Sequence, residues 1–579
     1  MSNSQLKKRI LLIALAAMLI LSTVACGAGT GSSTTAAPSS ATTAVDQTTA
    51  GTTVAEAKDP FGKYEPMITI NAARKSRPNI KFIDGEDYTN NAVSKEYKDQ
   101  LGIDVQYDWI VDESQYEAKV NLSIASGDIP DAFQVTNTQE QQLIDAGLIL
   151  DLTDIFEQYA SPMMKKIVQG NPLLYKTVLV NDRLYDIPMM PSIDFNINVL
   201  HIRKDWMDKL GLTPPKTSDE LWNVMDAFVN RDPDGNGKKD TIGLSLNKDL
   251  DNIVGVGDAG PLFFMYKAYR NAWIKDASGK LVYGSVQPEM KTALQNAQEL
   301  YKKGLIDPEF AVKDQGKVAQ DIVAEKSGME FGCFWTPAYP WNDLKKKNTN
   351  MDMYNLDIPT MNGEAVNSVV ILNPLVKLVV SKDCKNPEAI IKLVNLAEEM
   401  WWGSSDLSKH WNEVRNDPKY KDIGGVDNNI PLMMMEPPTL NYDLYQEVTD
   451  GVNAKDPNVA KTAEGIIEVQ NSLKYLNDGD LNQWGIWKLR AGPESSTYIS
   501  NKRQDNKNYI VSGFYGSPGP VQTEKASTLK KMEQEIITKI IMNAAPVSDF
   551  DKFVEQWKTS GGDEITAEIN AWYEKNKDK

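Results

Sequence analysis

The sequence is poor in the residues on which several protein classes depend. It has three cysteines, at Cys26, Cys333 and Cys384, and two histidines, at His201 and His410. These counts exclude a small disulfide-stabilised scaffold and argue against a histidine-rich catalytic metal site. The net charge is −17, so the chain lacks the excess of basic residues that nucleic-acid binding requires. We expect Cys333 and Cys384 to be unpaired thiols.

One apolar run stands out, at residues 10–21, and no later run is long enough to span a membrane. It follows three cationic residues and leads into a stretch of small residues, which is the order found in secretory signal peptides. The run is shorter than the roughly 20 residues that cross a bilayer. We therefore predict that residues 1–25 are a signal peptide and that the mature chain works outside the cytoplasm.

Cys26 follows directly, in a segment that resembles a bacterial lipobox with Thr23 in place of the usual leucine. The resemblance implies that Cys26 becomes the first mature residue and carries a lipid anchor. Residues 26–62 are dominated by Gly, Ser, Thr and Ala, and they cannot bury enough apolar surface to fold. They are predicted to form a flexible tether between the membrane and a folded body.

The rest of the chain is too long for one compact core, so at least two lobes are expected. Residues 67–72, 103–110 and 131–135 have the composition of strands, and residues 116–125 have helical periodicity. This β-α-β order predicts an α/β fold with a largely parallel sheet. Further helices are predicted at residues 217–229, 287–303, 386–399, 523–542, 548–558 and 564–575.

The loop at residues 232–240 has the oxygen spacing of a calcium site. Its side-chain oxygens stand at positions 1, 3, 5 and 9 of an EF-hand loop, with glycine at position 6. Position 12 is Gly243, where an EF-hand has a bidentate glutamate. A solvated turn that needs no metal is the alternative. We predict a structural Ca²⁺ outside the ligand cleft, held by Asp232, Asp234, Asn236, Asp240 and the carbonyl of Lys238.

Several motifs occur in a fixed order along the chain. The most informative segment, residues 199–244, contains HIRKDWMDKLGL, PPKTSDEL and DPDGNGKKD. Shorter motifs are SGDIPD at residues 126–131, LYDIP at 184–188, GLIDPEF at 304–310, NPEA at 386–389 and a closing segment at 557–573. Together they resemble the family 1 extracellular solute-binding proteins, in their longer, oligosaccharide-associated branch. The resemblance covers nearly the whole mature chain.

This resemblance implies a two-lobed α/β fold of the type II periplasmic-binding-protein kind, with the ligand cleft between the lobes. One lobe would comprise residues 63–197 and 371–430, and the other residues 198–370 and 431–579. The chain would cross between them near residues 196–200 and 369–374.

Aromatic side chains are the candidate ligand contacts. The chain has 13 tryptophans, and flat aromatic faces stack on sugar rings, although a single tryptophan is more often part of a core. Trp273 lies in an Asn-x-Trp element that resembles a cleft-facing element of the family, and Arg203 would matter for a carboxylated ligand. The predicted ligand-binding residues are Trp273, Trp335, Tyr339 and Trp401, with Trp109 and Arg203 as weaker candidates.

These features predict a lipid-anchored solute-binding protein at the outer face of a bacterial membrane. It would capture a carbohydrate, in particular an oligosaccharide, and deliver it to the permease subunits of an ABC importer. We expect a monomer with no enzymatic activity and no nucleic-acid partner. One alternative is a surface glycoside hydrolase that acts through a carboxylate pair and would shorten its ligand. Another is a surface adhesin, whose gene would lack importer genes beside it.

Overall fold

The computed structural model describes residues 57–77, 80–190, 192–250, 255–372, 376–420 and 430–577. The predicted signal peptide, Cys26 and most of the predicted tether lie outside these residues. The end of that tether packs on the folded body: the Lys58 amide donates to the Gln158 carbonyl (2.9 Å), and Lys392 Nζ donates to the Gly62 carbonyl (2.8 Å). The folded body therefore begins a few residues earlier than the composition indicates.

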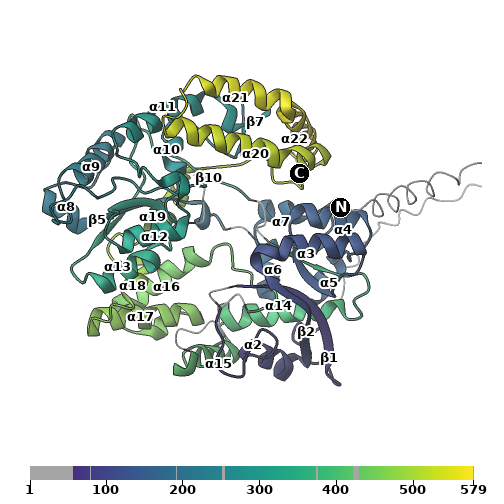
Figure 1. Ribbon diagram of the computed structural model, residues 1–579. Coiled ribbons are helices and arrows are strands. Elements are labelled where there is room, and N and C mark those ends of the chain that lie inside the picture. The colour runs from purple at the N-terminus through teal and green to yellow at the C-terminus, as the bar shows by residue number, and fades with distance from the viewer. Residues whose placement is uncertain are drawn as a thin grey trace, which may run out of the picture. The chain divides into compact units, whose positions relative to one another are not determined.

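The first lobe is built on a five-stranded sheet in the order β2-β1-β3-β11-β4. β1 pairs in parallel with β2 and β3, as predicted, whereas β11 runs antiparallel to β3 and β4. The strands are β1 (Ile68–Ser76), β2 (Ile103–Asp112), β3 (Ala132–Val135), β4 (Asp186–Pro188) and β11 (Lys377–Val380) (Figure 1).

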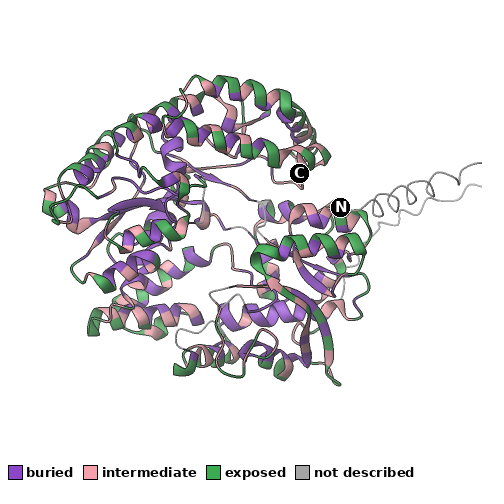
Figure 2. Cartoon of the chain, viewed as in Figure 1, coloured by how far each residue is buried: buried purple, intermediate pink, exposed green. Residues whose placement is uncertain are grey.

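Successive side chains of this sheet enter two different cores. In β11, Leu378 and Val380 belong to the larger core and Val379 to the smaller one, as the two-residue period of a strand requires. β3, β4 and β11 are buried along most of their length, whereas β2 is exposed toward its end, as are the outer faces of the helices (Figure 2). The larger core receives α5 (Thr153–Tyr159), α6 (Pro162–Gln169), α7 (Pro172–Val178) and α14 (Pro387–Trp402), and the smaller one α3 (Glu113–Ser126) and α4 (Asn137–Asp145).

The second lobe has a three-stranded antiparallel sheet in the order β8-β5-β9, with its own core. Thr217 and Glu220 form a capping box that starts α9, so the predicted helix begins where its sequence indicates. The sheet consists of β5 (Val199–Arg203), β8 (Met329–Gly332) and β9 (Met353–Leu356). The predicted helices of this lobe are present as α9 (Ser218–Asn230), α11 (Pro288–Lys302), α20 (Pro520–Ile541), α21 (Asp549–Trp557) and α22 (Asp563–Asn576).

Two chain passages between the lobes touch one another. One leads from β4 to β5, and the other leads from β10 (Ser368–Val370) to β11. The Ile371 amide of the second donates to Asn196 Oδ1 of the first (3.0 Å). β10 also pairs with β12 (Tyr509–Val511), which brings a third segment to the same place. A backbone amide of one passage is thus bound to a side chain of the other, and β12 pairs with the strand from which the second passage leads.

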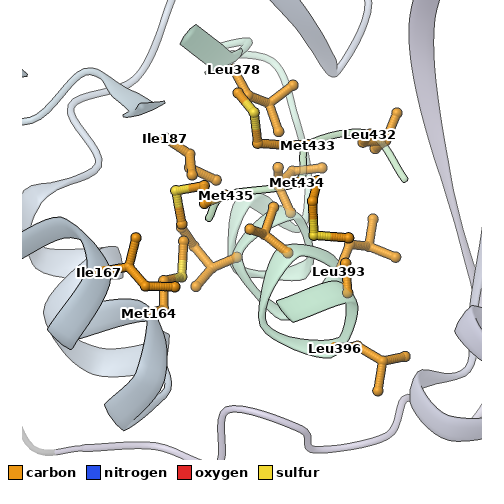
Figure 3. Packing of buried hydrophobic residues seen from close by; sticks show 14 of the residues in the cluster. Met164, Ile167, Ile187, Leu378, Leu393, Leu396, Leu432, Met433, Met434 and Met435 are labelled. Carbon is orange, nitrogen blue, oxygen red and sulfur yellow. The ribbon is translucent and has the colours of Figure 1, made fainter. Parts of the chain in front are cut away.

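The first lobe extends past the predicted boundary at residue 430. Met433, Met434 and Met435 pack between Leu378 of β11 and Leu393 of α14 (Figure 3). Their unbranched side chains fill a space bounded by three different elements, which explains a run of apolar residues with no regular period. The chain then forms four helices that pack on one another: α16 (Leu440–Ala454), α17 (Ala463–Asp478), α18 (Trp484–Arg490) and α19 (Ser496–Asp505).

Cys333 and Cys384 are both buried and free, which confirms the prediction of unpaired thiols. In the part of the chain that the structure describes, no helix has both the length and the hydropathy needed to cross a membrane.

Candidate functional site

A cavity of about 1160 Å³ has walls from both lobes. The first lobe contributes α4, α7 and the tight turn at residues 180–182, and the second contributes the loop at residues 515–519 and the last turns of α22. A volume of this size exceeds that of an ordinary small-molecule pocket, so it has room for several linked rings. The cavity is therefore the candidate ligand site.

The second-lobe wall depends on two glycines. A Cβ on Gly516 would stand 2.4 Å from Trp572 Nε1, and a Cβ on Gly519 would stand 2.3 Å from the Glu568 carboxylate. Because these two glycines have no side chains, the loop lies directly on α22. There the ring of Trp572 packs edge-on against Tyr515, with the ring centres 4.7 Å apart. The loop and the helix thus present a joined aromatic pair to the cavity.

Glu568 also fixes the start of α20 behind this wall. Its carboxylate accepts hydrogen bonds from the amides of Val521 (3.2 Å) and Gln522 (3.0 Å). These amides belong to the first turn of α20, where N–H groups have no helical partner, and the residue before the helix, Gly519, has no side chain to cap them. A carboxylate from another helix therefore takes the place of a local N-cap.

The first-lobe wall carries one aromatic ring and several amides. Thr136 and Gln139 form a capping box that starts α4, and Gln141, Gln142 and Asp145 of this helix line the cavity. Gln141 donates to Asp145 (2.9 Å). Tyr175 on α7 is partly buried and lines the same cavity. Aromatic rings thus stand on both walls, among amides and a few charges of both signs, which is the surface that a hydroxyl-rich ligand requires.

A buried charged triad supports the first-lobe wall from behind. Lys377 Nζ, at the start of β11, lies 2.5 Å from Glu140 on α4 and 3.1 Å from Asp186 on β4. All three residues are at most 2% exposed. Burial, and then the charge of Asp186, raises the pKa of Glu140 to about 9. The pKa of Lys377 is raised by the two carboxylates against the effect of burial. The triad thus joins α4 to β4, where the first passage begins, and to β11, where the second passage ends.

A second polar cluster lies where the passages meet the helices α16 to α19. Arg490 donates to Glu468 (2.8 Å) and to Asn441 (2.8 Å), and Asp194 of the first passage accepts from Ser192 (3.2 Å) and Gln504. Burial raises the pKa of Asp194. Burial also raises the pKa of Glu436 to about 7, against the lowering effect of Arg490. Glu436, at the junction of the lobes, therefore has a pKa near neutral pH.

Three of the residues predicted to bind ligand lie in the interior. Trp401 is 1% exposed and packs on Trp411, with the ring centres 4.7 Å apart. Trp273 is 7% exposed and packs on Tyr283. Arg203 is 1% exposed and pairs with carboxylates on either side of it. Protein groups thus occupy the faces that these side chains would need for a ligand.

The other three predicted residues are more accessible but do not line the cavity. Trp335 is partly buried between two small cores of the second lobe, and Tyr339, close by on the same segment, is 49% exposed. Trp109 on β2 is partly buried against Tyr116. The structure brings Trp335 and Tyr339 together and leaves Trp109 in the other lobe.

The cavity residues Tyr175, Tyr515 and Trp572 were not selected from the sequence. Tyr515 heads the loop YGSPG, which joins a strand to a long helix. An aromatic residue at the start of a Gly- and Pro-rich connection is a usable signal, because such connections are exposed and often carry function. Trp572 and Tyr175 lie in regular helices and carry no comparable signal.

The polar groups of the calcium-like loop are hydrogen-bonded to one another. Asn236 Nδ2 donates to Asp234 (2.6 Å) and to Asp240 (3.1 Å), and the amides of Gly235 and Gly237 donate to Asp232. Burial raises the pKa of Asp234, as do the neighbouring carboxylates. Among the residues covered by the structure, no three acidic, histidine or cysteine side chains already stand at metal-holding distance. The donor set fits Ca²⁺ if the Asn236 amide turns its oxygen inward and the loop tightens.

Comparison with known proteins agrees with this architecture. A family model described as bacterial extracellular solute-binding protein matches residues 83–399. The chain is 23% identical over 540 residues to lipoprotein LipO of Bacillus subtilis (strain 168), covering 90% of this chain and 93% of LipO. It is 23% identical over 500 residues to the polygalacturonan/rhamnogalacturonan-binding protein YtcQ of the same organism, covering 83% and 88%.

A solved structure shows the same fold. An HMO-binding, ABC-transporter-associated solute-binding protein from Bifidobacterium longum infantis superposes with a TM-score of 0.61 at 18% identity, covering 88% of this chain and 98% of that one. The expected two-lobed α/β fold is thus confirmed. On the family match, which spans more than half of its length, the chain belongs to the bacterial extracellular solute-binding proteins.

Proposed function

We propose that this protein captures an oligosaccharide in the cavity between its lobes and delivers it, unchanged, to an ABC importer. The observation that carries the proposal is the pairing of aromatic surfaces on opposite walls: Tyr175 from the first lobe, and Tyr515 with Trp572 from the second. A flat ligand contacts the rings of both walls at once only when the two lobes close on it. Binding is then coupled to closure.

The kinship supports the same ligand class. YtcQ is named for two polysaccharides, and the Bifidobacterium protein for HMO binding and an ABC transporter. Family members bind solutes, so the role proposed here is binding rather than catalysis. LipO is named as a lipoprotein, and this supports a lipid on Cys26 that holds the monomeric body at the outer face of the membrane.

The loop at residues 232–240 is proposed to hold a structural Ca²⁺. Asp232, Asp234 and Asp240 would supply carboxylate oxygens, and Asn236 its amide oxygen. The ion would neutralise carboxylates that otherwise repel one another, and it would do so on the second lobe, outside the cavity.

The test uses the ectodomain from residue 57 and a panel of oligosaccharides. A bound sugar should raise the apparent Tm, and Trp572→Ala should weaken its Kd about tenfold or more, which corresponds to ~1.4 kcal/mol. Trp222→Ala is the matched control, because Trp222 is also partly buried in the second lobe but lies outside the cavity. Its Kd should stay within about twofold of wild type.

Two results would overturn the proposal. One is a panel in which no oligosaccharide changes Tm. The other is chromatography showing that the bound sugar is recovered shortened, which would make the protein a hydrolase. Delivery is tested in the source bacterium, where loss of this gene should abolish uptake of the sugar that the ectodomain binds.

A further inference from the structure

A second hollow adjoins the cavity in which the sugar is placed. It is a groove of about 710 Å³ on the first lobe, lined by residues of α3 and α4. Thr138 and Gln142 of α4 line both the groove and the ligand cavity of about 1160 Å³. The two spaces thus meet along one edge of α4, and a ligand that extends over this edge reaches the groove.

The helical positions of α4 explain the shared edge. At about 3.6 residues per turn, Thr138 and Gln142 form one row on the helix surface. Gln141 and Asp145 lie on one side of this row and line only the ligand cavity, whereas Gln139 lies on the other side and lines only the groove. α4 is therefore a ridge between two hollows, and the ligand site does not have to end at it.

α3 supplies the other wall of the groove. Its lining residues are four, three and one positions apart, which places them on one face of the helix: Glu117, Asn121, Ile124 and Ala125. Among the described residues of the lining, Glu117 alone carries a charge, and Ile124 and Ala125 offer apolar surface. The volume falls in the range of roughly 300–1,000 Å³ that small-molecule sites have, so the groove has room for a sugar ring.

A chain of hydrogen bonds decides which atom of Asn121 is available to a ligand. The Thr136 amide can only donate, so it is the side-chain oxygen of Gln139 that lies 3.0 Å from it. The side-chain nitrogen of Gln139 then donates to Asn121 Oδ1 (2.8 Å). Asn121 Nδ2 consequently remains as a donor on an exposed residue, and the described part of the chain provides no acceptor for it.

The two residues of the shared edge also have polar groups to offer. The side chains of Thr138 and Gln142 make no hydrogen bond to any other residue that the structure describes, and both are accessible. A hydroxyl and two amides thus stand in a line from the ligand cavity into the groove, beside the apolar surface of α3. Sugar rings need both, because their hydroxyls take hydrogen bonds and their C–H faces take apolar contacts.

We propose that the groove between α3 and α4 is an accessory subsite, which binds a further sugar residue of the same ligand. One part of the oligosaccharide would lie between the aromatic walls of the ligand cavity. The chain would then cross α4 at Thr138 and Gln142 and place its next residue beside Asn121. The preferred ligand is accordingly a chain longer than the ligand cavity alone accommodates. The inference rests on the proposed function, since it concerns the length of the same ligand.

The experiment titrates the ectodomain with linear oligosaccharides of increasing length, by calorimetry. The probes are malto-, cello-, β-1,4-galacto- and α-1,4-galacturono-oligosaccharides, each from the dimer to the octamer. In a series that binds, Kd should fall with length until both spaces are filled. Asn121→Ala should weaken the longest member about threefold to tenfold, as the loss of one hydrogen bond does, and leave the shortest binding member within about twofold of wild type.

A second variant tests the groove without changing Asn121. Ala125→Arg places a long side chain in the groove from an exposed position, and it should weaken the long members while sparing the short ones. Gln115→Ala is the matched control, because Gln115 is also exposed on α3 but lines neither space. This variant should bind every member as wild type does.

Three results would refute the subsite while oligosaccharide binding stands. One is an affinity that does not rise beyond the shortest binding member. Another is an equal loss for short and long members in Asn121→Ala, which would mean that the change only disturbs α4. The third is a loss for long members in Gln115→Ala as large as that in Asn121→Ala. If no sugar of the panel binds, the proposed function fails and the subsite fails with it.

Discussion

Removing the cation of the buried triad should cost far more stability than neutralising one of its acids. In Lys377→Met, the carboxyl groups of Glu140 and Asp186 lose the ammonium at 2.5 and 3.1 Å and stay buried, because both residues are 0% exposed. Because Glu140 and Asp186 share one cation, its removal leaves the pair with a buried charge that has no partner, which costs about 3–5 kcal/mol. That is a large share of the roughly 5–15 kcal/mol that holds a domain folded.

Glu140→Gln should behave differently. The pKa of Glu140 is raised to about 9, so the folded protein holds a proton on this side chain at pH 7. A glutamine of the same shape then replaces a group that is already neutral. The expected loss is about 1 kcal/mol or less. The assay is urea unfolding at pH 7, monitored by circular dichroism. The free energies of unfolding of wild type and both variants are compared with a common slope of free energy against urea concentration.

The pH dependence gives an independent check. The pKa of Glu140 is higher in the folded chain than its ordinary 4.5, so the folded state binds the extra proton between about pH 4.5 and 9. The contribution of this group to the free energy of unfolding is therefore present at low pH and is lost as the pH rises through that window. Glu140→Gln should remove this part of the slope. The reasoning is refuted if Lys377→Met costs less than about 1 kcal/mol, or if Glu140→Gln costs as much as Lys377→Met.

Four further predictions concern the lobe junction, the cavity wall, the calcium loop and the anchor. The pKa of Glu436 is raised to about 7, so the free energy of unfolding should fall as the pH rises from 5 to 8. Glu436→Gln should make the urea midpoint less dependent on pH over this range. Gly516→Ala would push the loop off Trp572 and should weaken sugar binding about tenfold with little change in Tm. Millimolar Ca²⁺ should raise Tm by about 2–5 °C, and Asp234→Asn should remove this shift. Cys26→Ala should move the protein from the membrane fraction to the medium, as fractionation would show.

Those helices and strands that were predicted have local signals. The capping box of Thr217 and Glu220 fixes where α9 begins, whatever packs on it later. The alternation that places Leu378 and Val380 in one core and Val379 in the other follows from strand geometry alone. Such features depend on neighbours within a few residues, so the sequence carries them in full.

The ligand-facing aromatics could not be predicted in this way, because exposure depends on partners that are distant along the chain. Trp401 ends a helix in a manner that favours a cleft rim, yet Trp411 covers it from the next helix. Trp572 looks like one more core residue of the last helix, yet it faces the cavity. Its place there depends on Gly516, which lies more than fifty positions earlier and has no side chain to cover the ring. A small residue opposite an aromatic one is therefore what decides between core and binding surface. That pairing becomes visible only when the two segments lie side by side.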